Sequence, residues 1–396
     1  MKLLKWFFVF LLIPLFVRAN GAQFVQTIDN PTILRSGPSE DYDRIAEVPK
    51  GIRFEVITTQ KNWFKVRVSS ILAGWIDSKS LKTTSKSSAS HPVLKYIKIE
   101  REKNDVRMDI LESEPGVVIT EEWLRPTVLW LKFQNTQAAL SELDYDPKDS
   151  MIQHVSVWQE FEDVVFVRID LKALYGYQIV QKDPEHLLIK FQLKPHGAGL
   201  RAWTICIDPG HGGKDTGAIG PTKFMEKAAT LSISKMLGSL LESRGAKVVY
   251  TRTSDISLVD PEAPILDELK ARVDAARSHD ANLFISVHCN ARPTTAEGRL
   301  ARGSYVYYFQ PHSYALAHAI SERLEKQIEE PKYGVIFRSF HVIRESDFPA
   351  ILVETAFISN PITEAKLREK RYQARIARGI FQGVLNYAKS TAAGGV

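Results

Sequence analysis

Four residues in the second half of the chain have types and positions that suit metal-dependent catalysis. His211, His288 and Glu354 each follow or end a short apolar stretch, and Glu226 stands where an amphipathic helix is predicted to begin. Two histidines and one carboxylate form the common ligand set of a catalytic zinc ion that keeps a position open for water. The remaining carboxylate is then expected to act as general base.

The first of these histidines lies in a glycine-rich turn, "PGHGG", at residues 209–213. Glycines allow a sharp turn and keep side-chain bulk away from a metal. We expect Asp208, just before the turn, to accept a hydrogen bond from His211 or His288. The same glycines do not fit a phosphate-binding loop, because a Walker A motif would need glycine at position 208 and no G-x-G-x-x-G frame is present. No H-E-x-x-H motif occurs in the chain either.

Each of the four residues, taken alone, has a plainer interpretation. A histidine after a strand is commonly a surface residue, and Glu226 also suits a helix N-terminus because of the helix dipole. Glu354 is the hardest to explain this way, since a carboxylate that ends an apolar strand is costly to bury unless it is paired or used. The metal-site hypothesis therefore depends on all four residues meeting in the fold.

The elements that must position them alternate between strands and helices. Apolar, strand-like stretches lie at 204–208, 246–252, 282–288 and 350–358, and helical periodicity occurs at 226–245, 266–279, 313–330 and 363–388. This alternation predicts an α/β domain with a mostly parallel sheet flanked by helices. In such sheets the ligand crevice lies beyond the carboxyl ends of the strands, where three of the four residues stand.

Before this domain, composition divides the chain into shorter regions. Basic residues, a twelve-residue apolar run and small residues in 1–22 are typical of a cleaved signal peptide. Residues 24–85 predict short strands separated by turns, 86–94 a serine- and lysine-rich linker, and 95–195 a β-sandwich. The α/β domain is expected at 203–389 and a flexible tail at 390–396. No transmembrane segment is expected in the mature chain.

Charge and cysteine content restrict the function only loosely. The chain has a formal net charge of +6, and residues 1–22 carry three basic and no acidic side chains, so the mature chain has +3. That value argues against nucleic acid as a partner, which requires a clustered basic face. Cys206 and Cys289 lie in apolar stretches, and the sequence leaves open whether they are paired.

Five motifs of the last domain resemble those of the type 3 N-acetylmuramoyl-L-alanine amidases, which are zinc enzymes of peptidoglycan cleavage. They occur in order within 204–387: "IDPGHGGKDTGAIG", "EK", "VVYTRTSD", "LFISVHCNA" and "PAILVETAFISN". The resemblance implies that His211, Glu226 and His288 bind Zn²⁺ and that Glu354 is the catalytic glutamate. It also leads us to expect Asn290 and Arg344 to contact the substrate.

The N-terminal regions resemble modules of cell-wall enzymes. Residues 24–85 are similar to a bacterial SH3 domain, with "RSGP" at 35–38, Trp63 and "GW" at 74–75 as the recognisable marks. This resemblance implies that the region is a small SH3-like β-barrel. The tryptophans fit core packing as well as ligand binding. Residues 95–195 are similar, in position and strand pattern, to the AMIN domain, a β-sandwich that targets amidases to the wall.

Together the resemblances imply hydrolysis of the amide between N-acetylmuramic acid and L-alanine, with peptidoglycan as partner. A zinc peptidase that cuts a stem-peptide amide and an inert wall-binding scaffold remain alternatives. The stretch before Arg272 is longer than is usual in the family. Residues 290–344 are too short for the inserted blocking helix of cell-division members, so no protein activator is expected, although the sequence does not exclude one.

The signal peptide implies export, with the periplasm favoured over secretion or attachment to the wall. Physiological role, stem-peptide preference and oligomeric state stay open, as do the ligands of the N-terminal modules.

Overall fold

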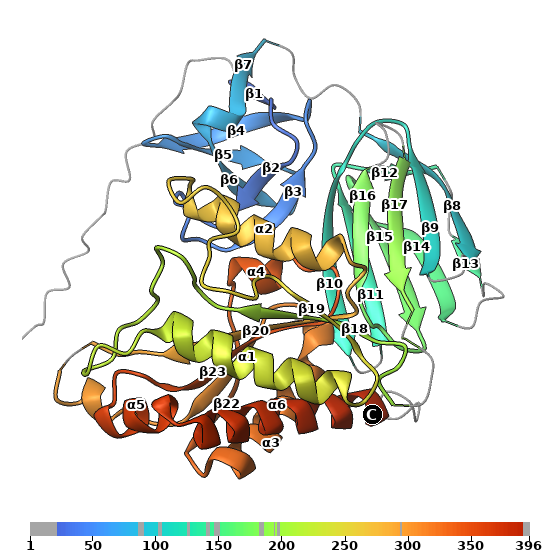
Figure 1. Cartoon of the computed structure of the whole chain (residues 1–396). Coiled ribbons are helices and arrows are strands. Elements are labelled where there is room, and N and C mark those ends of the chain that lie inside the picture. Colours follow the sequence, from blue (N-terminus) through green and yellow to red (C-terminus); the bar gives the residue numbers. More distant parts are fainter. Residues whose placement is uncertain are drawn as a thin grey trace, which may run out of the picture. The chain divides into compact units, whose positions relative to one another are not determined.

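The computed structural model describes residues 22–85, 91–101, 105–124, 127–139, 143–145, 151–181, 186–193, 195, 199–293 and 295–390. The chain forms two compact units, 1–91 and 92–396, whose elements are labelled in Figure 1. The division falls within the predicted linker 86–94. The predicted signal peptide, apart from Ala22, lies outside the described residues, as does the predicted tail beyond Ser390.

The first unit is a sheet of seven strands in the order β3-β2-β6-β5-β4-β1-β7. The strands are β1 (Phe24–Thr27), β2 (Thr32–Arg35), β3 (Arg44–Val48), β4 (Arg53–Gln60), β5 (Trp63–Arg67), β6 (Ala73–Asp77) and β7 (Leu81–Thr84), with a short 3-10 helix at Ser78–Ser80. Alternating residues such as Leu34, Val66 and Ile76 are fully buried and form its core. Trp63 and Trp75 are half-buried, so the choice between packing and binding stays open for both.

The second unit begins with two five-stranded sheets that share a core. One sheet has the order β10-β11-β15-β14-β13 and the other β12-β8-β9-β17-β16. The strands are β8 (Val93–Arg101), β9 (Asp105–Glu112), β10 (Val117–Leu124), β11 (Thr127–Gln134), β12 (Gln137–Ala138), β13 (Leu143–Tyr145), β14 (Ile152–Phe161), β15 (Val164–Leu171), β16 (Tyr177–Gln181) and β17 (His186–Gln192). β8 begins inside the predicted linker 86–94. Met108 of one sheet and Leu131 of the other belong to the same buried cluster.

The C-terminal domain is built on a six-stranded mixed sheet in the order β19-β18-β20-β23-β21-β22. Its strands are β18 (Thr204–Pro209), β19 (Lys247–Tyr250), β20 (Leu283–Asn290), β21 (Ser304–Tyr308), β22 (Lys332–Phe337) and β23 (Ala350–Phe357). β18, β19, β20 and β23 pair in parallel, and so do β21 and β22. The β21–β23 pair is antiparallel, which the sequence analysis did not predict.

Helices cover both faces of this sheet (Figure 1). One face packs against α1 (Glu226–Glu242), α3 (Tyr314–Ile328) and α6 (Lys370–Ser390), and the other against α2 (Ile265–Arg277) and α4 (His341–Arg344). One helix was expected over residues 363–388, but the structure has two, α5 (Pro361–Arg368) and α6. The break occurs because the backbone of Glu369 between them is extended. Within the described part of the chain, no helix has the length and apolarity needed to cross a membrane.

The helix expected between residues 290 and 344 is α3. Its buried side chains, including Leu316, Ile320 and Leu324, belong to the domain core. The helix therefore packs against the sheet as a structural element.

Candidate metal centre

The glycine-rich turn after β18 is held by two buried arginines. Arg252 donates from Nε to the carbonyl of Pro209 (2.9 Å) and from Nη2 to that of Gly210 (2.9 Å). Arg272 donates from Nη1 to the carbonyl of Pro209 (3.0 Å) and from Nη2 to that of His211 (3.0 Å). These contacts hold His211 in a left-handed backbone conformation (φ 63°) that is uncommon outside glycine.

Asp208 supports the turn rather than the histidines, so the expected contact to His211 or His288 is wrong. Its carboxylate accepts from Arg272 Nη1 (2.7 Å), Thr251 Oγ1 (2.6 Å) and Ser286 Oγ (2.7 Å). Burial acts to raise its pKa, but the Arg272 guanidinium and these hydroxyls hold the pKa of Asp208 below its ordinary value. Asp208 is thus the counter-charge of the arginine that fixes the turn.

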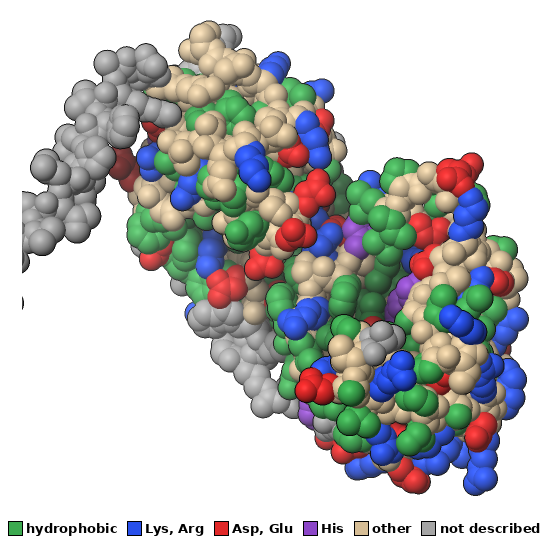
Figure 2. Space-filling view, turned by 90° about the vertical axis from the view of Figure 1, so that its left-hand side faces the viewer, with side chains coloured by type: hydrophobic (Ala, Val, Ile, Leu, Met, Phe, Trp, Pro, Cys, Tyr) green, Lys and Arg blue, Asp and Glu red, His purple; other side chains and the backbone are tan. Residues whose placement is uncertain are grey.

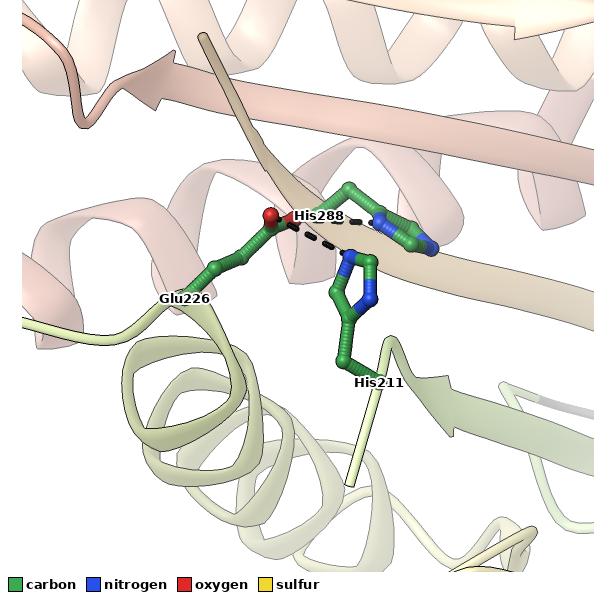
Figure 3. Close-up of side chains that lie close together, drawn as sticks. All are labelled: His211, Glu226 and His288. Carbon is green, nitrogen blue, oxygen red and sulfur yellow. Dashed lines mark hydrogen bonds and ion pairs between the residues drawn. The ribbon is translucent and has the colours of Figure 1, made fainter. Parts of the chain in front are cut away.

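Three of the four predicted residues converge at the carboxyl edge of the sheet (Figure 3). Ligand atoms of His211, Glu226 and His288 all lie within 4.8 Å of one another. Glu226 Oε2 is 3.1 Å from His211 Nε2, and Glu226 Oε1 is 3.1 Å from His288 Nδ1. The two imidazole rings lie 4.9 Å apart between centroids. His211 lies in the turn after β18, Glu226 is the first residue of α1, and His288 lies near the end of β20.

Backbone amides fix the carboxylate of this group. Glu226 Oε2 accepts from the Ala218 N–H (2.9 Å), and Oε1 accepts from the Cys289 N–H (2.8 Å). The side chain is only 5% exposed. Although burial acts to raise its pKa, hydrogen bonds from His211 and His288 hold the pKa of Glu226 well below its ordinary value. The carboxylate is therefore ionised and already oriented toward both imidazoles.

The partner of the first histidine is Asp215, which the sequence analysis missed. Asp215 Oδ2 lies 2.7 Å from His211 Nδ1, and Oδ1 accepts from the Gly217 N–H (2.9 Å). Burial opposes protonation, but the hydrogen bonds to Asp215 and Glu226 raise the pKa of His211 to about 9. With Nδ1 bonded to Asp215, Nε2 is the nitrogen directed at Glu226.

Two glycines are required by the imidazoles rather than by turn geometry alone. A Cβ on Gly210 would lie 2.4 Å from the ring of His288. A Cβ on Gly217, whose φ is +62°, would lie 2.6 Å from the ring of His211 and 2.7 Å from Glu226 Oε2. Gly210 and Gly217 thus provide space for the candidate ligands.

Glu354 lies on the strand next to His288. The two residues are register partners in the parallel pair β20–β23. Its Oε2 is buried and has no hydrogen-bond partner among the described residues. Burial and the Glu226 carboxylate raise the pKa of Glu354 to about 7, against the opposing effect of the histidines. A carboxyl with this pKa can both accept and release a proton near neutral pH.

The two residues expected to contact substrate have different surroundings. Asn290, two residues after His288, is half-buried at the end of β20, and its carbonyl accepts from the Ile358 N–H (2.8 Å). Arg344, at the end of α4, donates to Glu345 Oε1 (2.7 Å) and to Ser339 Oγ (3.0 Å). A role in substrate binding stays a prediction for both.

The donor set fits a zinc ion. Two imidazole nitrogens and one carboxylate face one another across a small space, and the glycines leave room for them. Asp215 fixes the tautomer of His211, as carboxylates do for metal-bound histidines. Cys206 and Cys289 are both free and buried, and neither belongs to this group.

Comparison with protein families identifies two regions of the chain. The model for N-acetylmuramoyl-L-alanine amidase matches residues 205–386, and the model for the bacterial SH3 domain matches residues 30–82. The first range contains all four residues discussed above.

Curated relatives match the same C-terminal region. The germination-specific N-acetylmuramoyl-L-alanine amidase of Bacillus subtilis is 30% identical over 226 residues, which cover 55% of this chain and 90% of that protein. The probable cell wall amidase LytH of Staphylococcus saprophyticus is 34% identical over 51% of this chain. The N-acetylmuramoyl-L-alanine amidase LytC of Bacillus subtilis is 36% identical over 46%. The matches span 64% of LytH and 35% of LytC.

A solved structure of an N-acetylmuramoyl-L-alanine amidase from Clostridium difficile 630 is 34% identical to this chain. The match covers 48% of this chain and 98% of that one, with a TM-score of 0.43.

Proposed function

Because this chain belongs to the N-acetylmuramoyl-L-alanine amidase family, we propose that it hydrolyses the amide bond between N-acetylmuramic acid and L-alanine in peptidoglycan, with Zn²⁺ as cofactor. The observation that carries the proposal is the convergence of His211, Glu226 and His288 on one small space, with Glu354 on the neighbouring strand. A carboxyl that is free to exchange a proton beside a metal ligand set suits amide hydrolysis.

In this proposal, His211, Glu226 and His288 are the zinc ligands. When bound, zinc supplies a Lewis acid that polarises the amide carbonyl and makes water a stronger acid. The protein's part is to orient His211 through Asp215 and to hold the Glu226 carboxylate in place through the amides of Ala218 and Cys289.

Glu354 is the proposed general base and acid. It takes a proton from the attacking water and returns it to the alanine nitrogen as the C–N bond breaks. Asn290 and Arg344 are proposed to contact the substrate around this centre.

The N-terminal modules are proposed to keep the enzyme at the wall. The family match supports a bacterial SH3 domain at 30–82, and the two sheets formed by β8 to β17, in the region predicted at 95–195, are proposed to act as an AMIN-like targeting domain. We propose that residues 1–22 direct export, with the periplasm as the site of action.

The test is mass spectrometry of the products that residues 23–396 release from purified sacculi. The amidase reaction yields intact stem peptides with a free N-terminal alanine, together with glycan strands that carry a free lactyl carboxyl. Shortened stem peptides would instead identify a peptidase, and an absence of any product from a zinc-loaded protein would identify an inert binding protein. Glu354→Gln is the control, since it should retain the fold.

A further inference from the structure

A row of aromatic side chains begins next to the proposed catalytic glutamate. Tyr305 of β21 is the register partner of Glu354 in the antiparallel pair β21–β23. Directly opposite residues of an antiparallel pair project from the same face of the sheet. The neighbouring strand β22 then contributes Tyr333. Three adjacent strands therefore place Glu354, Tyr305 and Tyr333 side by side.

The tyrosine rings are stacked in parallel. The centroids of Tyr305 and Tyr333 lie 4.7 Å apart with an interplanar angle of 7°, and those of Tyr305 and Tyr307 lie 5.9 Å apart at 3°. The ring of Phe357 meets Tyr305 and Tyr333 at steep angles of 71° and 77°. The stack has a defined orientation, because each ring is held by its neighbours.

The outer member of the stack is open to solvent. Tyr333 is 47% exposed although Tyr305 covers one of its faces, whereas Phe357 is buried. A Cβ on Gly303 would lie 2.8 Å from the Tyr333 ring, so the backbone approaches the ring closely at that point. Figure 2 draws one face of the protein, on which hydrophobic side chains lie next to histidine side chains. A large exposed aromatic surface beside a candidate active site is commonly a ligand contact.

The distance from the stack to the proposed chemistry is short. Tyr333 lies two strand spacings from Glu354, about 10 Å across the sheet. That separation is within the length of a disaccharide. A substrate whose scissile amide lies at Glu354 can therefore reach Tyr333 with a neighbouring part of the same molecule.

We propose that Tyr333, backed by Tyr305, binds the flat face of a sugar ring of the glycan strand next to the residue that is cleaved. This inference rests on the proposed amidase function. One face of a pyranose ring presents C–H groups, which pack on the negative face of an aromatic ring and remove apolar surface from water. The stem peptide is the less suitable occupant of the Tyr333 ring face, because its free carboxylates would bond to a cation such as Arg292, which lies over the ring of Phe357.

The experiment compares two soluble substrates that carry the same stem peptide. One is the monosaccharide N-acetylmuramoyl-peptide, and the other is an oligosaccharide strand with uncrosslinked stem peptides. In Tyr333→Ala, KM for the oligosaccharide should rise about 10-fold at unchanged kcat, while KM for the monosaccharide stays the same. Tyr333→Phe retains the ring and should behave like the wild type. Tyr314→Ala, which removes a tyrosine that is 40% exposed on α3, is the matched control and should change neither value.

A second readout separates sugar from peptide as the occupant. A peptide-free glycan oligosaccharide should inhibit the wild type and should inhibit Tyr333→Ala about 10-fold more weakly. Inhibition by free stem peptide that depends on Tyr333 would overturn the proposal, as would equal KM changes for both substrates. If the wild type releases no peptide from either substrate, the proposed function fails instead.

Discussion

The arginine clamp on the glycine-rich turn gives the most specific prediction about how the fold holds the proposed metal site. Arg272→Met removes a buried guanidinium that bonds to Asp208, Glu268 and the carbonyls of Pro209 and His211. Asp208 is 1% exposed and would lose its cation. Removing one member of a buried ion pair typically costs about 3–5 kcal/mol, because the other charge stays buried and unpaired.

The same substitution should weaken metal binding. Without Arg272, the carbonyl of His211 loses its donor, and the left-handed backbone at that residue is less well fixed. Loss of a contact that orients a metal ligand typically lowers affinity by about 10- to 100-fold. Stability is measured by denaturant unfolding, with a signal that reports on unit 92–396 alone. Zinc affinity is measured by competition against a chromogenic chelator.

Arg277→Met on the same helix is the control. Arg277 forms a partly exposed ion pair with Asp347, so its loss should cost at most about 1 kcal/mol and leave zinc affinity unchanged. If Arg272→Met unfolds at the same denaturant concentration as Arg277→Met and binds zinc like the wild type, the proposed role of the clamp is refuted.

Three further predictions concern single residues. Asp215→Asn should lower zinc affinity about 10-fold or more without unfolding the domain, because His211 loses the carboxylate that fixes its tautomer; unchanged affinity in a chelator titration would contradict this. Gly217→Ala should abolish zinc binding, since the added methyl group would meet His211 and Glu226; stoichiometric zinc in the purified variant would show the site is more tolerant. Burial raises the pKa of Glu112 from 4.5 to about 7. The protonated carboxyl therefore contributes to stability below pH 4.5, and this contribution is lost as the pH rises through 7. The free energy of unfolding should fall by up to about 3 kcal/mol over that range. Glu112→Gln should therefore raise the thermal midpoint at pH 8 and hardly change it at pH 4.5, and an equal pH dependence in both proteins would argue against this account.

The convergence of the candidate ligands could be predicted because it depends on regular elements. His288 and Glu354 end apolar strands, and parallel strands bring their carboxyl ends to one edge of a sheet. Glu226 was expected at the same edge because the helix that follows the first strand begins at this residue. Strand and helix periodicity are visible in a single sequence, so this part of the site follows from pattern and topology.

The residues that support the ligands could not be found in this way. Asp215 reaches His211 through an irregular turn, and Arg252 and Arg272 approach it from elements more than 40 residues away. The expectation for Asp208 was wrong because a buried carboxylate takes the strongest donor nearby, and that donor is Arg272.

Two strands of the C-terminal sheet were missed for a related reason. β21 and β22 are short, and β21 lies antiparallel to β23, so the alternation of strands and helices gives no sign of them. The aromatic stack beside Glu354 is a product of that pairing. Its tyrosines carry no recognisable spacing in the sequence, since Tyr305 and Tyr333 come from different strands.

The central claim is that three side chains hold one zinc ion while Glu354 moves the proton. The most direct test is the zinc content and hydrolytic rate, on purified sacculi, of the same preparations of wild type, His288→Ala and Glu354→Gln. We expect one zinc per chain in the wild type and in Glu354→Gln, hydrolysis by the wild type alone, and no zinc in His288→Ala. Zinc retained by His288→Ala, or wild-type hydrolysis by Glu354→Gln, would contradict the account.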